Sequence, residues 1–257
     1  DEDAMRQSAE IVERSKPELL DINYGCPVKK VVCKDAGAGI LKNIPKMVKL
    51  TKAIVESTNL PVTVKTRLGW DQSSMKIVEV AERLQDVGIK AISIHGRTRV
   101  QMDKGQANWK PIADVKNNSR MFIPVFGNGD VDSPEKAKLM RDTYGLDGAM
   151  IGRASIGNPW FFNKVKMFLN NGERLKEPSI IQRVEVARRH LEMSILWKGE
   201  ILGVLETRRH YSNYFKAIPD FKKFRTGLVT ANSSIEVFNL LNQIEQKARL
   251  KKEIILD

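Results

Sequence analysis

Short strand-like segments alternate with helical patterns through the first 155 residues, and this alternation constrains the fold more than any other feature of the sequence. Between these segments, apolar residues recur at helical spacing, as at Ile77, Val80 and Leu84. Strands that alternate with helices form parallel βα units. The segments expected to be strands are 18–23, 61–66, 91–95, 122–126 and 149–151.

The number of strands predicts an α/β fold of the TIM (β/α)8 barrel type, with about five of the eight units present. The chain opens on a helical pattern, with Met5, Ala9 and Val12 on one face. We therefore expect about three strands to be missing, and we expect them to precede the first residue. An open sheet of this kind exposes two edges and part of its core.

The alternation stops after the expected barrel. Residues 171–179 are polar and contain Gly and Pro, which is typical of a linker. Val184, Ala187 and Leu191 then follow helical spacing, without a strand-like run. The sequence therefore predicts three parts, which are a partial barrel at 1–170, a linker at 171–179 and an all-α domain at 180–257.

Composition and charge narrow the class of protein. A net charge of +12 at pH 7 favours a polyanionic partner such as nucleic acid, although solvated lysines give the same total. No apolar run is long enough to span a membrane, and the first residues lack the order of a signal peptide. Two cysteines argue against a disulfide framework and fit a reducing cytoplasm. We expect a cytoplasmic monomer that binds neither a metal nor a membrane.

Each expected strand has an apolar body and ends in polar, reactive or glycine residues. In α/β barrels, the active site is built from the carboxyl ends of the strands and the loops after them. The same change at every strand end is a stronger signal than any single motif. The endings are Asn23-Tyr24-Gly25-Cys26-Pro27, Lys65-Thr66-Arg67, His95-Gly96-Arg97-Thr98-Arg99, Gly127-Asn128-Gly129-Asp130 and Gly152-Arg153-Ala154.

The last two endings predict a phosphate site. Glycine lets backbone N–H groups approach an anion closely, and a helix after Gly152 directs its N-terminus to the same place. Arg153 can add a bidentate contact. The alternative is that these glycines only form tight turns.

Lys65 and His95 stand at strand ends, where they can face an anionic ligand. The alternatives are a solvated or salt-bridged lysine and a structural histidine. Arg97 and Arg99, next to His95, favour an anion-facing cluster.

Cys26 lies in a Gly-Cys-Pro turn after the first expected strand. A thiol there can be a nucleophile, a proton donor or a metal ligand, and the alternative is an inert buried cysteine. A metal is disfavoured because Cys33 lies seven residues on, without a Cys-x-x-Cys pair or a nearby histidine. A proton donor needs only position and an ordinary thiol, so it is the least demanding functional interpretation.

The expected helical domain carries two basic clusters. The first cluster contains Arg188 and Arg189, and the second contains Arg208 and Arg209. Tyr and Phe residues follow the second cluster, a mixture that suits a phosphate backbone with exposed bases. The alternative is a basic solvated face above core aromatics.

The strand endings together resemble the tRNA-dihydrouridine synthases, nearest to their bacterial B-type members. VARRHL and TRRHYSNYFK resemble the helical domain of that family, so the resemblance covers nearly the whole chain. The matching segments of the barrel are DINYGCPVKKVV, VTVKTRLGW, ISIHGRTRVQ, VFGNGDV and MIGRASIGNPW.

The resemblance implies an oxidoreductase that holds FMN in a TIM barrel and reduces one uridine of tRNA to dihydrouridine. NADPH would reduce the flavin, the flavin would give hydride to C6 of the uracil, and Cys26 would protonate C5. The residues that match FMN contacts are Lys65, His95, Asn128, Gly129, Asp130, Gly152 and Arg153. The residues expected at the substrate are Asn23, Arg67 and Arg97 for the uracil, with Arg188, Arg189, Arg208 and Arg209 for the tRNA.

Two family features that also contact FMN are not found in the chain, namely a Pro-Met-Ala-Gly-type strand end and a later glutamine. Two other functions therefore stay open. One is another FMN-dependent TIM-barrel oxidoreductase, such as a dihydroorotate dehydrogenase-like protein. The other is a non-catalytic tRNA-binding fragment that has lost its flavin site.

We predict that the 257-residue polypeptide alone folds poorly or binds FMN weakly, because its expected sheet is open. Flavin absorbance of the purified chain, compared with its protein concentration, measures this. Tight, stoichiometric flavin would refute the prediction.

Overall fold

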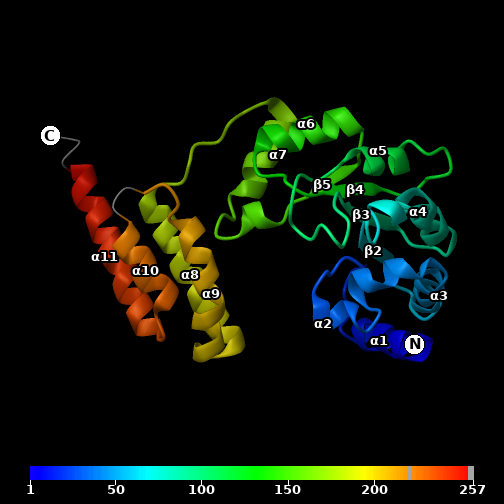
Figure 1. The fold of residues 1–257 in the computed structure, drawn as a ribbon. Coiled ribbons are helices and arrows are strands. Elements are labelled where there is room, and N and C mark those ends of the chain that lie inside the picture. Colours follow the sequence, from blue (N-terminus) through cyan, green and yellow to red (C-terminus); the bar gives the residue numbers. More distant parts are fainter. Residues whose placement is uncertain (219–220, 254–257) are drawn as a thin grey trace. The chain divides into compact units, whose positions relative to one another are not determined.

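The computed structural model describes residues 1–218 and 221–253, and it contains two compact units, Asp1–Gly152 and Arg153–Asp257. All strands of the described residues lie in the first unit, whereas the second is helical (Figure 1). Helix α7 (Phe161–Asn171) belongs to the second unit. The functional boundary expected at 171–179 stays a prediction.

The strands of the first unit form one parallel sheet in the order β1-β2-β3-β4-β5, as the alternation predicts. Their bounds are β1 (Leu20–Asn23), β2 (Val62–Arg67), β3 (Ala91–His95), β4 (Val125–Asn128) and β5 (Gly148–Met150). The expected start of the fourth strand at Phe122 is wrong. Pro124 has no N–H to donate to a ladder, and Phe122 is 85% exposed.

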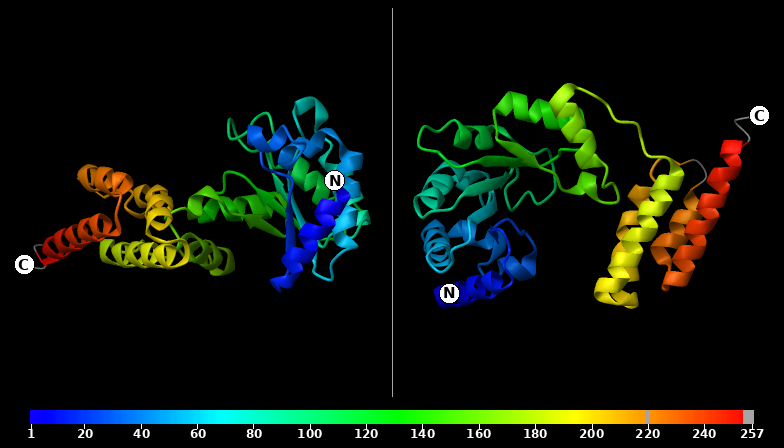
Figure 2. Two further views of the ribbon diagram at one scale, coloured as in Figure 1. Left: turned by 90° about the horizontal axis from the view of Figure 1, so that it is seen from below. Right: turned by 180° about the vertical axis from the view of Figure 1, so that it is seen from behind.

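Helices follow the strands and cover one side of the sheet (Figures 1 and 2). Their bounds are α1 (Glu2–Arg14), α2 (Lys29–Val32), α3 (Ile44–Val55), α4 (Ile77–Asp86), α5 (Lys110–Lys116) and α6 (Pro134–Tyr144). Short 3-10 turns are η1 (Gly37–Lys42), η2 (Gln72–Ser74) and η3 (Arg153–Ser155). Within 1–218 and 221–253, no helix has the length and apolar character needed to cross a membrane.

The two faces of the sheet differ in polarity. Side chains alternate along each strand, and paired residues of parallel strands point to the same side. Val64 and Ile92 are paired and fully buried, as is Ile94 two residues on. The intervening residues, such as Lys65, are only partly buried. The apolar face therefore forms the core, and the polar face is left for a site.

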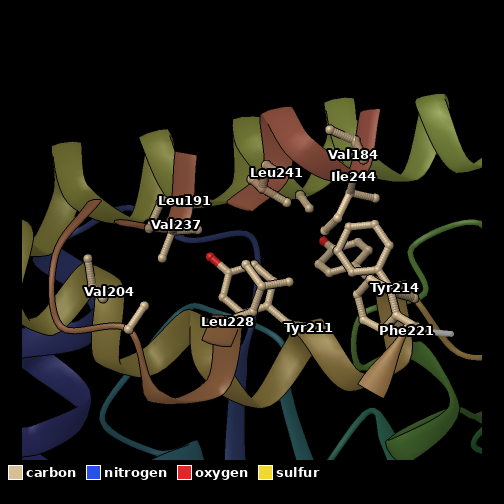
Figure 3. Close-up of a cluster of buried hydrophobic side chains, with 13 residues drawn as sticks. Val184, Leu191, Val204, Tyr211, Tyr214, Phe221, Leu228, Val237, Leu241 and Ile244 are labelled. Atoms are coloured by element: carbon tan, nitrogen blue, oxygen red, sulfur yellow. The ribbon is translucent and has the colours of Figure 1, made fainter. Parts of the chain in front are cut away.

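The second unit adds α8 (Ile180–Lys198), α9 (Glu200–Tyr214), α10 (Lys222–Thr230) and α11 (Ser234–Glu253). Their core contains Leu191, Leu228 and Leu241 together with aromatic side chains (Figure 3). Tyr211 and Phe215 are at most 2% exposed. These aromatics are therefore core residues, and they are buried away from any base that would stack on them.

Thr66 provides a test of the buried side of the sheet. Its side chain is fully buried, and its Oγ1 has no hydrogen-bond partner among the described residues. We expect Thr66→Val to raise the free energy of unfolding by about 1 kcal/mol, because an unpaired buried hydroxyl is replaced by a methyl group. Chemical denaturation measures this.

Thr51→Val is the matched control. Thr51 is equally buried, but its Oγ1 donates to the Met47 carbonyl over 2.8 Å and lies 3.1 Å from the Tyr24 hydroxyl. We expect this substitution to lower the free energy of unfolding by about 1 to 2 kcal/mol. A change of the same sign in the free energy of unfolding of both variants would contradict the assignment of Thr66 Oγ1 as unpaired and Thr51 Oγ1 as hydrogen-bonded.

Candidate active site at the carboxyl ends of the strands

Polar side chains form a row across the carboxyl ends of the strands. Arg67 pairs with His95, and His95 pairs with Asn128. Lys65, two residues before Arg67 in β2, pairs with Asn23 of β1. Because alternate residues share a face, all these side chains leave the same side of the sheet. The structure thus brings together residues that are far apart in the sequence.

The loop after β1 holds Cys26 at a fixed place. Its free thiol belongs to a half-buried residue. The Gly25 N–H donates to Asn23 Oδ1 over 2.9 Å, and the Cys26 carbonyl accepts from the Ala38 N–H over 2.9 Å. A Cβ on Gly37, which has φ +54°, would come within 2.8 Å of the Cys26 carbonyl oxygen. The turn therefore needs glycine there and leaves the Cys26 backbone little freedom.

Lys65 lies beside this loop. Its Nζ is 3.6 Å from the position that a Cβ on Gly25 would take. Burial lowers the pKa of Lys65, the charge of Arg67 lowers it further, and Asp21 opposes the shift. An anion at this point would restore the ordinary affinity of the amine for its proton.

Arg67 is 6% exposed and joins the loops after β1 and β3. Its Nε donates to the Gly25 carbonyl over 2.8 Å, and its Nη1 donates to the carbonyls of Thr98 at 3.2 Å and Met102 at 2.9 Å. Burial is the main cause that lowers the pKa of Arg67. Much of its donor capacity is thus used within the protein. A contact between Arg67 and uracil stays a prediction.

Arg97 pairs with Asp130 across the loops after β3 and β4. Its Nη2 lies 2.7 Å from Asp130 Oδ2, and the Arg97 side chain is only 3% exposed. Asp130 Oδ2 also accepts from the Ala107 N–H over 2.8 Å. The expected contacts of Arg97 with uracil and of Asp130 with FMN stay predictions. In the structure the two side chains form a partly buried ion pair that joins the two loops.

The Gly129-Asp130 turn depends on glycine. Gly129 has φ +125°, and a Cβ there would come within 2.6 Å of the Ala107 Cβ. The indole Nε1 of Trp109 donates to the Gly129 carbonyl over 3.1 Å. Trp109 and Ala107 were not expected at the site, because they lie in a loop without a chemical motif.

His95 is a neutral hydrogen-bond donor. Its Nδ1 accepts from the Arg97 backbone N–H over 3.2 Å, so the ring proton of the neutral form is on Nε2. Burial lowers the pKa of His95 to about 4, followed by the charges of Arg67 and Lys65. At neutral pH the site therefore combines two cations with an uncharged imidazole.

Asn128 and Gly152 complete the expected flavin contacts in the first unit. The Asn128 side-chain amide donates to the Met150 carbonyl over 2.8 Å. A Cβ on Gly152 would meet no atom within 4 Å, so the backbone there borders open space. Arg153 begins the second unit. Phosphate contacts of Gly152 and Arg153 stay predictions.

The four arginines expected to bind tRNA divide into two kinds. Arg188 donates to Asn242 Oδ1 over 3.0 Å, and Arg208 donates to the Ala231 carbonyl over 2.9 Å. These two join helices or loops within the second unit. Arg189 and Arg209 are exposed. Their contacts with tRNA stay predictions, as do those of Arg188 and Arg208.

The pKa of His95 can be tested by NMR titration of its ring. The folded pKa of about 4 lies below the ordinary 6.5, so the unfolded chain takes up the proton first as the pH falls. The contribution of His95 to stability is therefore present above about 6.5 and is lost as the pH falls toward 4.

Lys65→Met should raise the pKa of His95, because one neighbouring positive charge is removed. Lys49→Met is the control, because Lys49 is an exposed lysine paired with Glu2. An unchanged His95 pKa in the Lys65 variant would contradict the proposed proximity of the two side chains.

Comparisons with known proteins identify the family of this chain. A family model described as dihydrouridine synthase (Dus) matches residues 1–252. The chain is 38% identical over 248 residues to "Probable tRNA-dihydrouridine synthase 1" of Synechocystis sp., covering 96% of this chain and 69% of that protein. It is 36% identical over 225 residues to tRNA-dihydrouridine synthase B of Pseudomonas putida, covering 88% and 66%. It is 37% identical over 225 residues to tRNA-dihydrouridine synthase B of Vibrio cholerae, covering 88% and 69%.

The chain spans about two thirds of the length of these relatives. The matched region includes every strand end that supplies the polar row. The chain therefore belongs to the dihydrouridine synthase family.

Proposed function

We propose that the chain takes part in the flavin-dependent reduction of a uridine in tRNA to dihydrouridine. The observation that carries this proposal is the row of Lys65, Arg67 and His95 at the strand ends, with the Cys26 thiol in the adjoining loop. The names of the relatives supply the substrate class, because they are tRNA-dihydrouridine synthases.

The residues of the row fit an anionic cofactor such as FMN. Lys65 and Arg67 are partly or fully buried cations, and an anion would compensate their charge. His95 offers a neutral N–H donor at Nε2. The backbone at Gly152 has room beside it, which a phosphate requires. FMN, when bound, would supply the hydride, and NADPH would restore its reduced form.

Each residue of the row then has a distinct role. Lys65 would balance the negative charge of the reduced flavin, and His95 would donate a hydrogen bond without adding charge. Asn128 and Gly129 would line the flavin, and Gly152 with Arg153 would bind its phosphate. Asp130 would act through Arg97, because the two side chains are paired.

Cys26 would deliver the proton. When hydride adds to C6 of the uracil, electron density moves to C5, and the Cys26 Sγ–H would protonate that carbon. Arg67 holds the Gly25 carbonyl, so it fixes the backbone next to the thiol. Asn23 also supports this turn by accepting from the Gly25 N–H.

The substrate must bring its uridine out of the stacked RNA to reach the strand ends, as in base flipping. The exposed Arg189 and Arg209 of the second unit would bind the phosphate backbone. The uracil would be positioned by Asn23, Arg67 and Arg97. The two arginines would act through the loops that they hold in place.

The proton-donor role is tested with Cys26→Ala. We expect the variant to bind as much flavin as the unmodified chain does, whereas its dihydrouridine formation falls by about 100-fold to 10,000-fold, because a general acid is lost. Flavin absorbance and dihydrouridine content of tRNA are the two measurements. Cys33→Ala is the control, since Cys33 is an exposed free thiol after α2.

Unchanged turnover in the Cys26 variant would exclude the role of this thiol. Loss of bound flavin would instead assign Cys26 to the cofactor site. RNA binding without any flavin would favour a non-catalytic tRNA-binding fragment.

A further inference from the structure

The loop that carries Arg153 is docked on helix α9 within the second unit. Gly157 has φ +61°, and a Cβ there would come within 2.3 Å of the His210 carbonyl oxygen and 3.0 Å of the Tyr214 nitrogen. Trp160, just beyond, packs edge-to-face on Tyr214 with ring centroids 6.2 Å apart. The loop thus lies directly on the helix backbone, and only glycine fits at this point.

Two overlapping hydrogen-bonded turns span residues 153–158, which include Arg153 and Gly157. The Ile156 N–H donates to the Arg153 carbonyl over 3.2 Å, and the Asn158 N–H donates to the Ser155 carbonyl over 3.1 Å. Gly157 and Arg153 therefore lie in the same short run of turns. Arg153 is the residue expected at the flavin phosphate.

The imidazole of His210 stands between this loop and an exposed cation. Its Nδ1 lies 3.1 Å from the Gly157 nitrogen, and its Nε2 lies 3.3 Å from Arg209 Nε. Both neighbours are N–H groups that donate toward the ring. A neutral imidazole has only one acceptor nitrogen, so it satisfies one donor at a time.

The surroundings keep His210 neutral. The His190 ring lies edge-on at 4.6 Å between centroids, and His190 Nδ1 is 3.0 Å from the Tyr214 hydroxyl. Burial lowers the pKa of His210 to about 4, followed by the charges of His190 and Arg209. A neutral imidazole has two tautomers, and here each tautomer would accept from a different partner.

We propose that His210 is a positioning residue that couples RNA binding at Arg209 to the order of the loop carrying Arg153. The proposal rests on the proposed function, because it assumes RNA at Arg209 and flavin phosphate at Arg153. When an RNA phosphate binds the Arg209 guanidinium, His210 Nε2 loses its hydrogen-bond donor. The ring proton then settles on Nε2, and Nδ1 accepts from the Gly157 N–H. RNA thereby holds the loop in place for the flavin phosphate, and by linkage the flavin strengthens RNA binding by the same factor.

The direct test is amide hydrogen exchange at Gly157, together with the FMN Kd from flavin fluorescence, with and without tRNA. In the unmodified chain we expect tRNA to slow exchange at Gly157 and to lower the FMN Kd by about fivefold. Bound tRNA that changes neither quantity would overturn the proposal.

Three variants separate the two hydrogen bonds. Arg209→Ala removes the competing donor, so Gly157 should be protected without tRNA. His210→Asn keeps an acceptor near the Nδ1 position, so the FMN Kd should be low and insensitive to tRNA. His210→Ala removes the acceptor, and tRNA should then leave both Gly157 exchange and the FMN Kd unchanged. Exchange at Gly157 that is the same in Arg209→Ala as in the unmodified chain would also overturn the proposal.

Matched controls account for effects on folding. Gly157→Ala and Gly172→Ala both place alanine at positive φ, +61° and +74°, but a Cβ meets the α9 backbone only at Gly157. Only Gly157→Ala should weaken FMN binding and abolish the effect of tRNA. Leu205→Ala, at an exposed position of α9, should keep the coupling.

The outcomes also separate this proposal from the proposed function. If no FMN binds at any concentration, the flavin assignment fails, and exchange at Gly157 still decides the coupling. If no tRNA binds, the RNA assignment fails and the coupling fails with it. If both bind and neither affects the other, only the coupling is wrong.

Discussion

The parallel register of the sheet is the constraint on which the first unit depends. Val64, Ile92 and Ile94 bury one face under the helices, so the alternating residues must leave the other face. A slip of one residue in β2 would bury the Lys65 amine and expose Val64. The apolar pattern that stabilises the core therefore also places the polar row on the opposite face of the sheet.

The charges of this row favour one kind of ligand. Burying Arg67 costs free energy, which three backbone carbonyls offset through hydrogen bonds. Burial also lowers the pKa of the neighbouring Lys65, and the charge of Arg67 lowers it further. His95 stays neutral beside the two cations. An anion would compensate the charges of Lys65 and Arg67, whereas a cation would add to them, so the row suits an anionic ligand better than a metal ion.

The sequence predicts the strands and their polar ends, but not how the ends are joined. β3 matches its expected bounds because its alternation is complete. The next strand begins later than expected, because Phe122 and Ile123 are apolar yet donate their N–H groups to the Gln85 side chain. The pairing of Arg97 with Asp130 depends on how two loops meet, which no local pattern encodes. Similarly, the sequence does not distinguish Arg188 and Arg208 from the exposed Arg189 and Arg209. Their hydrogen bonds to Asn242 and Ala231 form only when the helices pack.

The second unit shows why a basic, aromatic stretch need not be an RNA-stacking surface. Tyr211 and Phe215 are buried in the core, whereas Arg209, on the same helix, is exposed. His210 lies between the buried core and the exposed surface. Its ring packs on His190, which is hydrogen-bonded to the core residue Tyr214. Its Nε2 faces the exposed Arg209 guanidinium. A rigid packing contact would transmit nothing, because it has one arrangement. A ring with one acceptor nitrogen between two neighbouring N–H donors has two arrangements, and a ligand that binds one donor selects between them.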